Sequence, residues 1–296
     1  IYQDPETQFA FWSIVGQALT GPLSVLLREL RGIRYLGPIR VVPPRNHRSP
    51  RTPLESRWAS GLGAWDALVR DPSLVEKTSH YVQEVLSLGY SIHREERIAI
   101  DAEGEIMAEL RLLTARYEEM DAAYLRRKVL DPLEQLPRQP VIQLHDEVSD
   151  IDVDPADIGV GVSQALPVVV GALDPGTSDH PCRIFAVEQP ELHVHPAVQV
   201  ALGDVFIDAT RGTDRIMLIE THSEHLLLRL LRRVRESGKE MDAVNRPEVT
   251  ADDLSVVYVR PTEKGVELTP LAVNKSGDFD EPWPEGFFDE RDSELF

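Results

Sequence analysis

Two short apolar runs that stop abruptly at polar residues constrain the fold of this chain more than any other feature. The first, residues 184–188, ends at Glu188, and the second, residues 215–220, is followed by Thr221 and His222. Parallel strands have this form because both faces of a parallel sheet are covered, and ligands bind outside the carboxyl ends of its strands. The two runs therefore predict parallel strands that bring polar groups to one edge of a sheet.

Helical and extended patterns alternate through the second half of the chain. The expected order is helix 163–173, strand 184–188, helix 197–210, strand 215–220, helix 223–237, strand 254–260, a turn at 263–265 and strand 266–273. Alternation at this spacing favours right-handed crossovers in a mainly parallel sheet flanked by helices. We therefore expect an α/β fold in which residues 141–296 form one lobe, with a small appendage from about residue 250.

The first half of the chain has a less regular pattern. It predicts helices at 64–70, 73–88 and 105–130, strands at 34–42 and 90–100, a proline-rich loop at 43–53, and a helical segment at 8–30 that Gly21 and Pro22 divide into two pieces. Pro137 and Pro140 predict a boundary, so residues 1–140 are expected to form a mixed helical and strand region.

Several of these segments, in their order and spacing, resemble the motifs of ABC-type ATPases. Residues 184–196 resemble the Walker B strand and D-loop, and residues 220–223 resemble the switch-histidine strand. Residues 157–167, Asp-Ile-Gly-Val-Gly-Val-Ser-Gln-Ala-Leu-Pro, resemble the signature motif. Residues 283–290 resemble the C-terminal motif of SMC-like bacterial AAA ATPases that carry a C-terminal domain of unknown function. The resemblance implies the C-terminal lobe of a P-loop NTPase head that binds ATP and Mg²⁺.

The resemblance also implies roles at the Walker B strand end. Glu188 would hold Mg²⁺, which prefers oxygen ligands. Gln189 stands where most relatives place the glutamate that polarises the attacking water. Because glutamine cannot accept the proton, and lost general-base help costs about 10²- to 10⁴-fold in rate, slow hydrolysis is expected unless Glu191 substitutes. The alternative is that Glu188 merely caps a strand.

The remaining implied contacts are to phosphate. A glycine-rich loop lets the backbone approach an anion, and the helix expected to begin near Ser163 would attract it. The residues expected to bind nucleotide are Gly159, Gly161, Ser163, Gln164 and, from the D-loop, His195. His222 would contact the γ-phosphate in catalysis; otherwise it is a strand-end histidine bonded to a loop carbonyl.

The chain contains no P-loop string, Gly-x-x-x-x-Gly-Lys followed by Ser or Thr, whose amides and lysine cradle phosphates. Relatives carry it near the N-terminus, and this sequence opens on Ile1 rather than on Met. The expectation is that an N-terminal lobe is missing from these 296 residues. A degenerate relative that does not bind nucleotide is the alternative.

Two metal sites can be weighed from composition. His193, His195, His222 and His225 could be taken for a zinc site, but no cysteine accompanies them and the loop identities already explain them. The aspartates at 150, 152 and 154 have calcium-loop spacing, yet the glycine and glutamate that such a loop requires are missing. We expect neither metal.

Charge argues against a nucleic-acid-binding surface over the whole molecule. The net charge is −19, whereas attraction to phosphate grows with the cations presented. One local exception is a run of arginines between residues 28 and 57, namely Arg28, Arg31, Arg34, Arg40, Arg45, Arg48, Arg51 and Arg57. It predicts either a nucleic-acid or anion contact, or a solvated loop, or pairing with an acidic partner.

The composition also bears on the compartment. Hydrophobic residues make up 42% of the chain, which is enough for a core, and the single cysteine, Cys182, cannot form an internal disulfide. The longest nearly apolar run is taken as 162–173, too short to span a bilayer. No signal peptide is recognised, so a cytoplasmic location without a membrane partner is expected.

The leading hypothesis is an ATPase head that forms a homodimer around nucleotide and controls a protein effector, in bacterial anti-phage defence or a DNA-linked process. The alternative is a nucleotide-sensing module with negligible turnover, which Gln189 and the absent P-loop favour. A head fused to a metal-dependent nuclease ranks lower, because residues 254–296 are too few for that domain.

Overall fold

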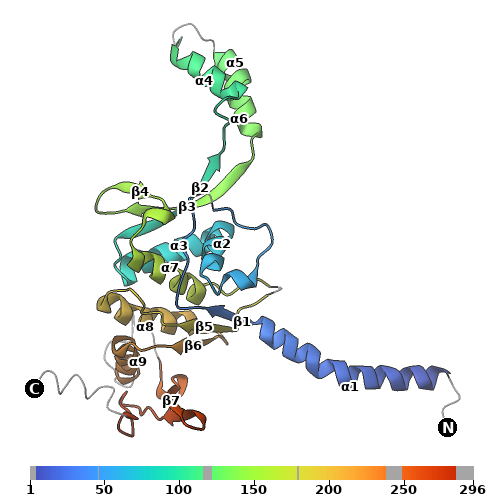
Figure 1. Cartoon of the computed structure of the whole chain (residues 1–296), viewed down its shortest axis with the longest axis vertical. Helices are drawn as coiled ribbons and strands as arrows, with labels where there is room; N and C mark the ends of the chain where they lie inside the picture. The colour runs from blue at the N-terminus through green and yellow to red at the C-terminus, as the bar shows by residue number, and fades with distance from the viewer. Residues whose placement is uncertain (1–4, 46, 116–121, 179, 238–248, 285–296) are drawn as a thin grey trace, which may run out of the picture.

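The computed structural model describes residues 5–45, 47–115, 122–178, 180–237 and 249–284. They form a mixed α/β fold built from a parallel sheet, an antiparallel sheet and a C-terminal hairpin (Figure 1). The parallel sheet, sheet A, has the order β1-β5-β6, and the antiparallel sheet, sheet B, has the order β2-β3-β4. Strands β7 and β8 pair only with each other among the described residues.

The helices are α1 (Pro5–Arg31), α2 (Leu62–Arg70), α3 (Pro72–His80), α4 (Glu105–Ala115), α5 (Ala122–Leu125), α6 (Asp131–Gln135), α7 (Val160–Leu173), α8 (Pro196–Thr210) and α9 (Glu224–Ser237). The strands are β1 (Ile33–Leu36), β2 (Tyr90–Ile98), β3 (Arg138–Asp146), β4 (Ile151–Val153), β5 (Ile184–Glu188), β6 (Ile216–Glu220), β7 (Val256–Thr262) and β8 (Gly265–Leu271). Short 3₁₀ turns occupy Glu55–Arg57, Pro155–Asp157 and Ala251–Asp253, and π-helical turns occupy Tyr81–Val85 and Arg126–Leu130.

Sheet A confirms the parallel strands predicted from the two apolar runs. Strand β5 lies in the centre and pairs in parallel with β1 on one side and β6 on the other. Helices α7 and α8 pack on one face, where Phe185 and Val187 are fully buried. Phe185 lies so close to α7 that a side chain at Gly171 would overlap its ring. This close approach requires glycine at that position.

The opposite face of sheet A is uncovered in the described part of the chain. On β6, Ile216 is 59% and Leu218 is 62% exposed. Ile33 and Tyr35 of β1 lie in register with them across β5 and are also exposed. Parallel sheets normally have both faces covered, so this apolar face is unusual for its type.

Helix α7 is the centre of the molecule. One side of the helix packs on sheet A through Ala165, Val168 and Val169, and the other side contributes Leu166 and Val170 to a second core. That second core is formed with α2, α3 and the base of sheet B. A helix with apolar residues all round is buried in this way.

Strands β2 and β3 form a long antiparallel hairpin that carries α4, α5 and α6 at its far end (Figure 1). The predicted boundary at 137–140 lies where β3 begins, so both sides of it belong to this hairpin. The single helix predicted at 105–130 is wrong. Helix α5 packs against α4 instead of continuing it, since the hydroxyl of Tyr124 donates to Glu109 at 3.0 Å.

Helix α1 is continuous, so the predicted break at Gly21 and Pro22 is wrong. Hydroxyl hydrogen bonds from Thr20 to Gly16 O (2.8 Å) and from Ser24 to Thr20 O (2.9 Å) flank the proline. The helix projects away from sheet A (Figure 1). This segment, rather than residues 162–173, is the longest apolar helix described.

Within Gln8–Arg31 of α1, an 18-residue window has a mean hydropathy of 1.4 and no buried part, and the helix is long enough to cross a membrane. A core helix or a signal sequence has the same length and composition. The finding corrects the statement that every apolar run is too short. The cytoplasmic location stays a prediction.

Two arginines close the amino end of sheet A around the end of α7. Arg34 donates to the backbone oxygen and the carboxylate of Asp174 at 3.0 and 3.1 Å, and its guanidinium lies 4.0 Å from the centroid of the Trp58 ring. Arg215 donates to the last carbonyls of α7, reaching Ala172 O at 2.6 Å and Asp174 O at 3.2 Å. Cations at a helix C-terminus satisfy carbonyls that lack partners within the helix.

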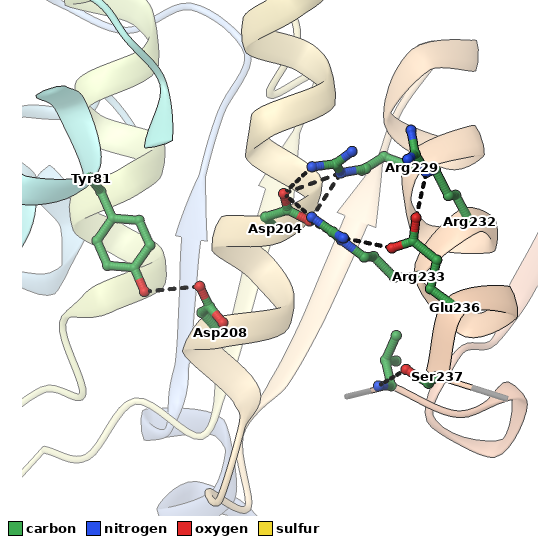
Figure 2. A network of polar contacts seen from close by, with 9 residues as sticks. Tyr81, Asp204, Asp208, Arg229, Arg232, Arg233, Glu236 and Ser237 are labelled. Atoms are coloured by element: carbon green, nitrogen blue, oxygen red, sulfur yellow. Dashed lines mark hydrogen bonds and ion pairs between the residues drawn. The ribbon is translucent and has the colours of Figure 1, made fainter. Parts of the chain in front are cut away.

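Helix α9 is fixed to α8 by charge (Figure 2). Asp204 of α8 accepts hydrogen bonds from both Arg229 and Arg233 of α9, and Arg233 also pairs with Glu236. One turn further along α8, Asp208 accepts a hydrogen bond from Tyr81 at 3.2 Å. These contacts join α8 to elements on both of its sides.

The C-terminal hairpin confirms the strands predicted at 254–260 and 266–273, with small shifts at their ends. Trp283 stacks edge-on against Phe279 and Tyr258, with ring centroids 5.3 and 6.0 Å apart. Arg235 of α9 pairs with Asp278 at 2.6 Å and so attaches this region to the lobe. The rest of the motif predicted at 283–290 lies outside the described residues beyond Pro284.

Candidate functional site

The carboxyl ends of β5 and β6 bring two carboxylates together. Glu188 ends β5 and lies in register with Glu220, which ends β6, and neighbouring strands are about 4.8 Å apart. The hydroxyl of Tyr35 donates to Glu188 at 2.9 Å, and Nε2 of His222 lies 3.4 Å from a Glu220 oxygen. The hydrogen bond to Glu188, with desolvation, raises the pKa of Tyr35 and keeps its hydroxyl protonated.

This pair of carboxylates fits the magnesium role predicted for Glu188. Both side chains lie on the uncovered face of sheet A, the face that also carries Tyr35 and Leu218, so water and phosphate can reach them. Magnesium in proteins is usually held by one or two carboxylates, several waters and substrate phosphates. The chain therefore supplies the number and kind of ligands that such a site requires.

Residues after β5 have strained backbone. Gln189 and His193 have φ angles of 43° and 62°, in the left-handed region that residues other than glycine seldom occupy. The amide of Gln189 donates to Glu220 O at 2.8 Å, which holds the end of β5 against the end of β6. Strain of this kind persists only where the surroundings enforce it, and it is concentrated at functional sites.

Glu191 connects the two strand-end loops. One carboxylate oxygen accepts from the hydroxyl of Thr221 at 2.8 Å, and the other accepts from the amide of His222 at 2.7 Å. Both oxygens are therefore engaged in holding the loop after β6. In this conformation Glu191 positions His222, whose side chain is 74% exposed.

Helix α7 begins at Val160, earlier than the start predicted near Ser163. Gly159 is its N-cap and provides no side-chain cap, so the N–H groups of the first turn have no such partner. Gly161 lies beside His193, and a side chain there would approach the His193 carbonyl to 3.3 Å. The glycines thus bring the start of α7 close to the loop after β5.

The structure places Ser163 and Gln164 inside the protein rather than at this anion-accessible turn. The Ser163 hydroxyl donates to Val160 O at 2.8 Å, and the Gln164 amide is bonded to the backbone of Arg40. Both residues are buried. Their side chains therefore do not face an anion in this conformation.

His195 has a local structural contact. Its Nδ1 accepts the amide of Ala197 at 3.2 Å and caps α8. Because Nδ1 is the acceptor, the proton of a neutral ring lies on Nε2. The predicted nucleotide contact of His195 would have to use this second nitrogen.

Arg40 lies at the back of the site and is 2% exposed. Its guanidinium donates to Glu188 O at 2.7 Å and to Gln189 O at 3.2 Å. Burial lowers the pKa of Arg40 to about 10, although the negative charge of Glu191 opposes the shift. The side chain is cationic at neutral pH.

Three residues of this edge were not predicted from the sequence: Tyr35, Arg40 and Glu220. Glu220 was visible as the polar end of an apolar run, which is the signal that identified Glu188. Tyr35 and Arg40 come from β1 and the loop after it, and no local pattern connects that segment to residues 150 positions away.

In the described residues no group of three or more His, Cys, Asp or Glu side chains is arranged to hold an ion. Two of the aspartates at 150–154 instead pair with His145: Asp152 at 2.9 Å and Asp150 at 3.3 Å. Asp154 caps the turn that follows. The absence of a zinc constellation applies to the described ranges only.

The arginines of 28–57 do not form one surface patch. Arg34 and Arg40 are buried, and Arg57 pairs with the buried Asp66 at 2.5 Å. Arg45 is exposed and pairs with Asp157, immediately before the glycine-rich loop, at 2.6 Å. Part of the predicted cluster therefore holds the fold together, and a nucleic-acid contact stays a prediction.

Comparison with known families gives a match at the C-terminal end of the chain. A family described as "Protein of unknown function (DUF3696)" matches residues 249–296, which include the β7–β8 hairpin and Trp283. This agrees with the predicted C-terminal domain of unknown function. The match does not reach the segments at 157–223 that carry the ATPase resemblance. No curated protein matches the chain.

Proposed function

We propose that this chain is the C-terminal lobe of an ABC-type ATPase head that binds ATP and Mg²⁺, hydrolyses ATP slowly, and dimerises around the nucleotide to control a protein effector. One observation carries the proposal. Two adjacent strand-end carboxylates, Glu188 and Glu220, lie at the same sheet edge as the uncapped start of α7. A cation and a polyphosphate together would match these opposite charges.

Each described group has a role in this proposal. Glu188 and Glu220 hold Mg²⁺, and the N–H groups of Val160 and Gly161 donate hydrogen bonds to phosphate oxygens. His222 is exposed beside Glu220, where it can reach a terminal phosphate. Gln189 orients the attacking water without taking its proton, so hydrolysis is slow.

The uncovered face of sheet A supports a further part of the proposal. The face carries apolar Ile216 and Leu218 next to Glu188. A P-loop lobe supplied by sequence outside these 296 residues would cover it and bring the missing phosphate-binding amides to the carboxylates. In this arrangement the 296 residues alone bind ATP weakly.

Calorimetric titration of residues 1–296 with Mg²⁺ and ATP tests that point. We expect no submicromolar affinity; tight binding would mean that an unrecognised phosphate loop is present. Phosphate release by the protein that also carries its P-loop segment tests hydrolysis. If that protein neither binds nor hydrolyses ATP, the proposed function is wrong.

The start of α7 can be tested separately. Val160 is exposed in the first helical turn, so Val160→Glu places a carboxylate where we expect phosphate. Val148→Glu is the matched control, since Val148 is an exposed valine in the turn before β4. Val160→Glu should weaken nucleotide binding by about 10-fold, the size of one charge contact, while Val148→Glu should leave it unchanged.

A second function is a nucleotide sensor with negligible turnover. It is favoured by Gln189, which stands at the position expected to orient the attacking water. Both functions share the site but differ in rate. The bacterial defence or DNA-linked setting rests on analogy with the architecture, and a fold of this kind serves many processes. Identification of proteins that bind only the ATP-loaded form would test the effector part.

A further inference from the structure

Arg40 forms hydrogen bonds with two parts of the site, helix α7 and the end of β5. Its backbone forms a two-bond bridge with Gln164 of α7: the Arg40 amide donates to Gln164 Oε1 at 3.1 Å, and Gln164 Nε2 donates to Arg40 O at 2.8 Å. Its guanidinium reaches the carbonyls of Glu188 and Gln189 at 2.7 and 3.2 Å. The same side chain thus contacts α7 and the end of β5.

The contacts of Arg40 are carbonyl oxygens rather than carboxylates. In addition to the two at the end of β5, a third guanidinium bond reaches Gln164 O at 3.4 Å, and the Nε group is buried without a partner. A buried charge without a paired carboxylate is costly to desolvate, which is why the pKa of Arg40 is lowered. Arg215 also donates to carbonyls, but those lie at the C-terminal end of α7, whereas the carbonyls that Arg40 reaches lie at the end of β5 beside Glu188.

Arg34 shows how this chain uses a buried arginine for structure alone. It also joins β1 to α7, but it pairs with the carboxylate of Asp174 and stacks on Trp58. Its Nε also pairs with Glu55 at 3.7 Å, so two carboxylates compensate its charge. Arg40, in contrast, donates a hydrogen bond to the carbonyl of Gln189, whose backbone is strained.

We propose that Arg40 and Gln164 are positioning residues that couple the start of α7 to the end of β5, so that phosphate bound at one and Mg²⁺ bound at the other act as one site. A shift of α7 moves Gln164, the bridge carries the shift to Arg40, and the fork of the guanidinium moves the carbonyls of Glu188 and Gln189 with it. A lysine cannot reproduce this coupling, because its single ammonium lacks the planar fork.

The catalytic part of this inference rests on the proposed function, whereas the coupling itself does not. Hydrogen–deuterium exchange measures the coupling without nucleotide, through peptides that cover residues 157–163 and 188–194. The variants are Arg40→Lys and Gln164→Met, which keeps the volume of Gln164 but removes both bridge bonds. Arg34→Lys is the matched control, because Arg34 is an equally buried arginine that contacts the other end of α7.

Arg40→Lys should raise exchange in both peptides by roughly 10-fold, within the 5- to 150-fold range of site–site coupling. Gln164→Met should also raise exchange in both peptides. If Arg40→Lys does not fold, the exchange of Gln164→Met tests the coupling on its own. Arg34→Lys should leave these two peptides unchanged. In the protein that hydrolyses ATP, Arg40→Lys should lower kcat by roughly 10-fold and raise the Mg²⁺ concentration for half-maximal rate, with KM for ATP little changed.

Equal exchange in both peptides for Arg40→Lys and Arg34→Lys would overturn the coupling, as would an unchanged kcat and Mg²⁺ dependence in an active protein. If the wild-type protein releases no phosphate, the proposed function fails, and the exchange data alone then support or overturn the coupling.

Discussion

The two ends of sheet A contain similar residues and use them differently. At the amino end, Arg34 and Arg215 satisfy the last carbonyls of α7, and Arg34 is neutralised by Asp174. Arg34, Asp174 and Arg215 themselves are not among the residues with left-handed backbone. At this end the helix carbonyls are satisfied and Arg34 is neutralised.

At the carboxyl end the balance is absent. Arg40 contacts carbonyls only, while Glu188 and Glu220 lie side by side without a cationic arginine or lysine partner among the ion pairs of the described residues. Gln189 and His193 are strained. Two adjacent carboxylates repel each other, so this end is incomplete without a cation.

The difference identifies which end is built for stability and which for a ligand. Both ends contact the same helix, α7, and both use a buried arginine next to β1. Only the carboxyl end leaves charge and strain uncompensated. The comparison predicts that substitutions at the amino end change folding free energy and not activity, whereas substitutions at the carboxyl end do the reverse.

The largest expected effect is at the amino end. Arg34→Met leaves the carboxylate of Asp174 buried without its partner, and breaking a buried ion pair in this way costs about 3–5 kcal/mol. Urea unfolding should show this loss. Arg28→Met is the matched control, because Arg28 is an exposed arginine whose pair with Glu29 is worth less than about 1 kcal/mol. Equal losses for both variants would contradict the structural role of Arg34.

At the carboxyl end, Glu188→Gln should reverse this pattern. The amide keeps the size of the side chain and the bond to Tyr35 but removes the charge that attracts Mg²⁺. Loss of metal stabilisation, worth several kcal/mol, lowers kcat by at least about 100-fold with little change in stability. Phosphate release over a Mg²⁺ series measures this. Glu263→Gln, in the β7–β8 turn, is the control, and a wild-type rate for Glu188→Gln would exclude the metal role.

The sequence predicted sheet A well because the signal is local. The runs 184–188 and 215–220 are short, apolar and ended by charge, and the strands begin and end within one residue of them. Glu188 followed from the same signal. The helix predicted at 105–130 was wrong because a local signal cannot show packing. Its helical pattern is continuous, whereas α5 packs against α4 through contacts such as that between Tyr124 and Glu109.

The local structure of the residues expected to bind nucleotide was harder to predict. A glycine-rich string does not reveal which residue caps the helix, and because Gly159 takes that place, Ser163 and Gln164 fall one turn too deep. Arg40 could not be found at all, since its partners lie 124 and 148 residues away. Contacts over such distances exist only once β1 has paired with β5.

A smaller effect is expected at Gln189. Gln189→Glu supplies a proton acceptor beside Glu188 and should raise kcat by about 10-fold, at the lower end of general-base effects. Gln189→Asn controls for the change of side chain at this strained position. Single-turnover phosphate release measures the rate. If Gln189→Glu has no effect while Glu191→Ala abolishes hydrolysis, Glu191 is the base, and its two bonds to Thr221 and His222 serve catalysis instead of positioning.

The smallest expected effect concerns pH and Asp208, which lies toward the amino end of the sheet on α8 (Figure 2). Burial raises the pKa of Asp208, the hydrogen bond from Tyr81 opposes the shift, and the charge of Asp204 adds to it. Because the folded pKa lies above the unfolded one, the stability that this group contributes is present at low pH and is lost as pH rises through the folded pKa.

Asp208→Asn should therefore stabilise the protein at neutral pH, by less than about 1 kcal/mol since the site is partly solvated. The gain should diminish as the pH falls through the raised pKa of Asp208, where the aspartate itself becomes protonated. Asp204→Asn is the contrasting variant. Burial disfavours the Asp204 carboxylate, but hydrogen bonds from Arg233 and Arg229 outweigh this and lower its pKa, so its replacement should destabilise at neutral pH. Thermal unfolding from pH 4 to pH 8 measures both, and hydrolysis should follow neither change. A fall in kcat for Asp208→Asn without a change in stability would mean that the two ends of the sheet are not separate in function.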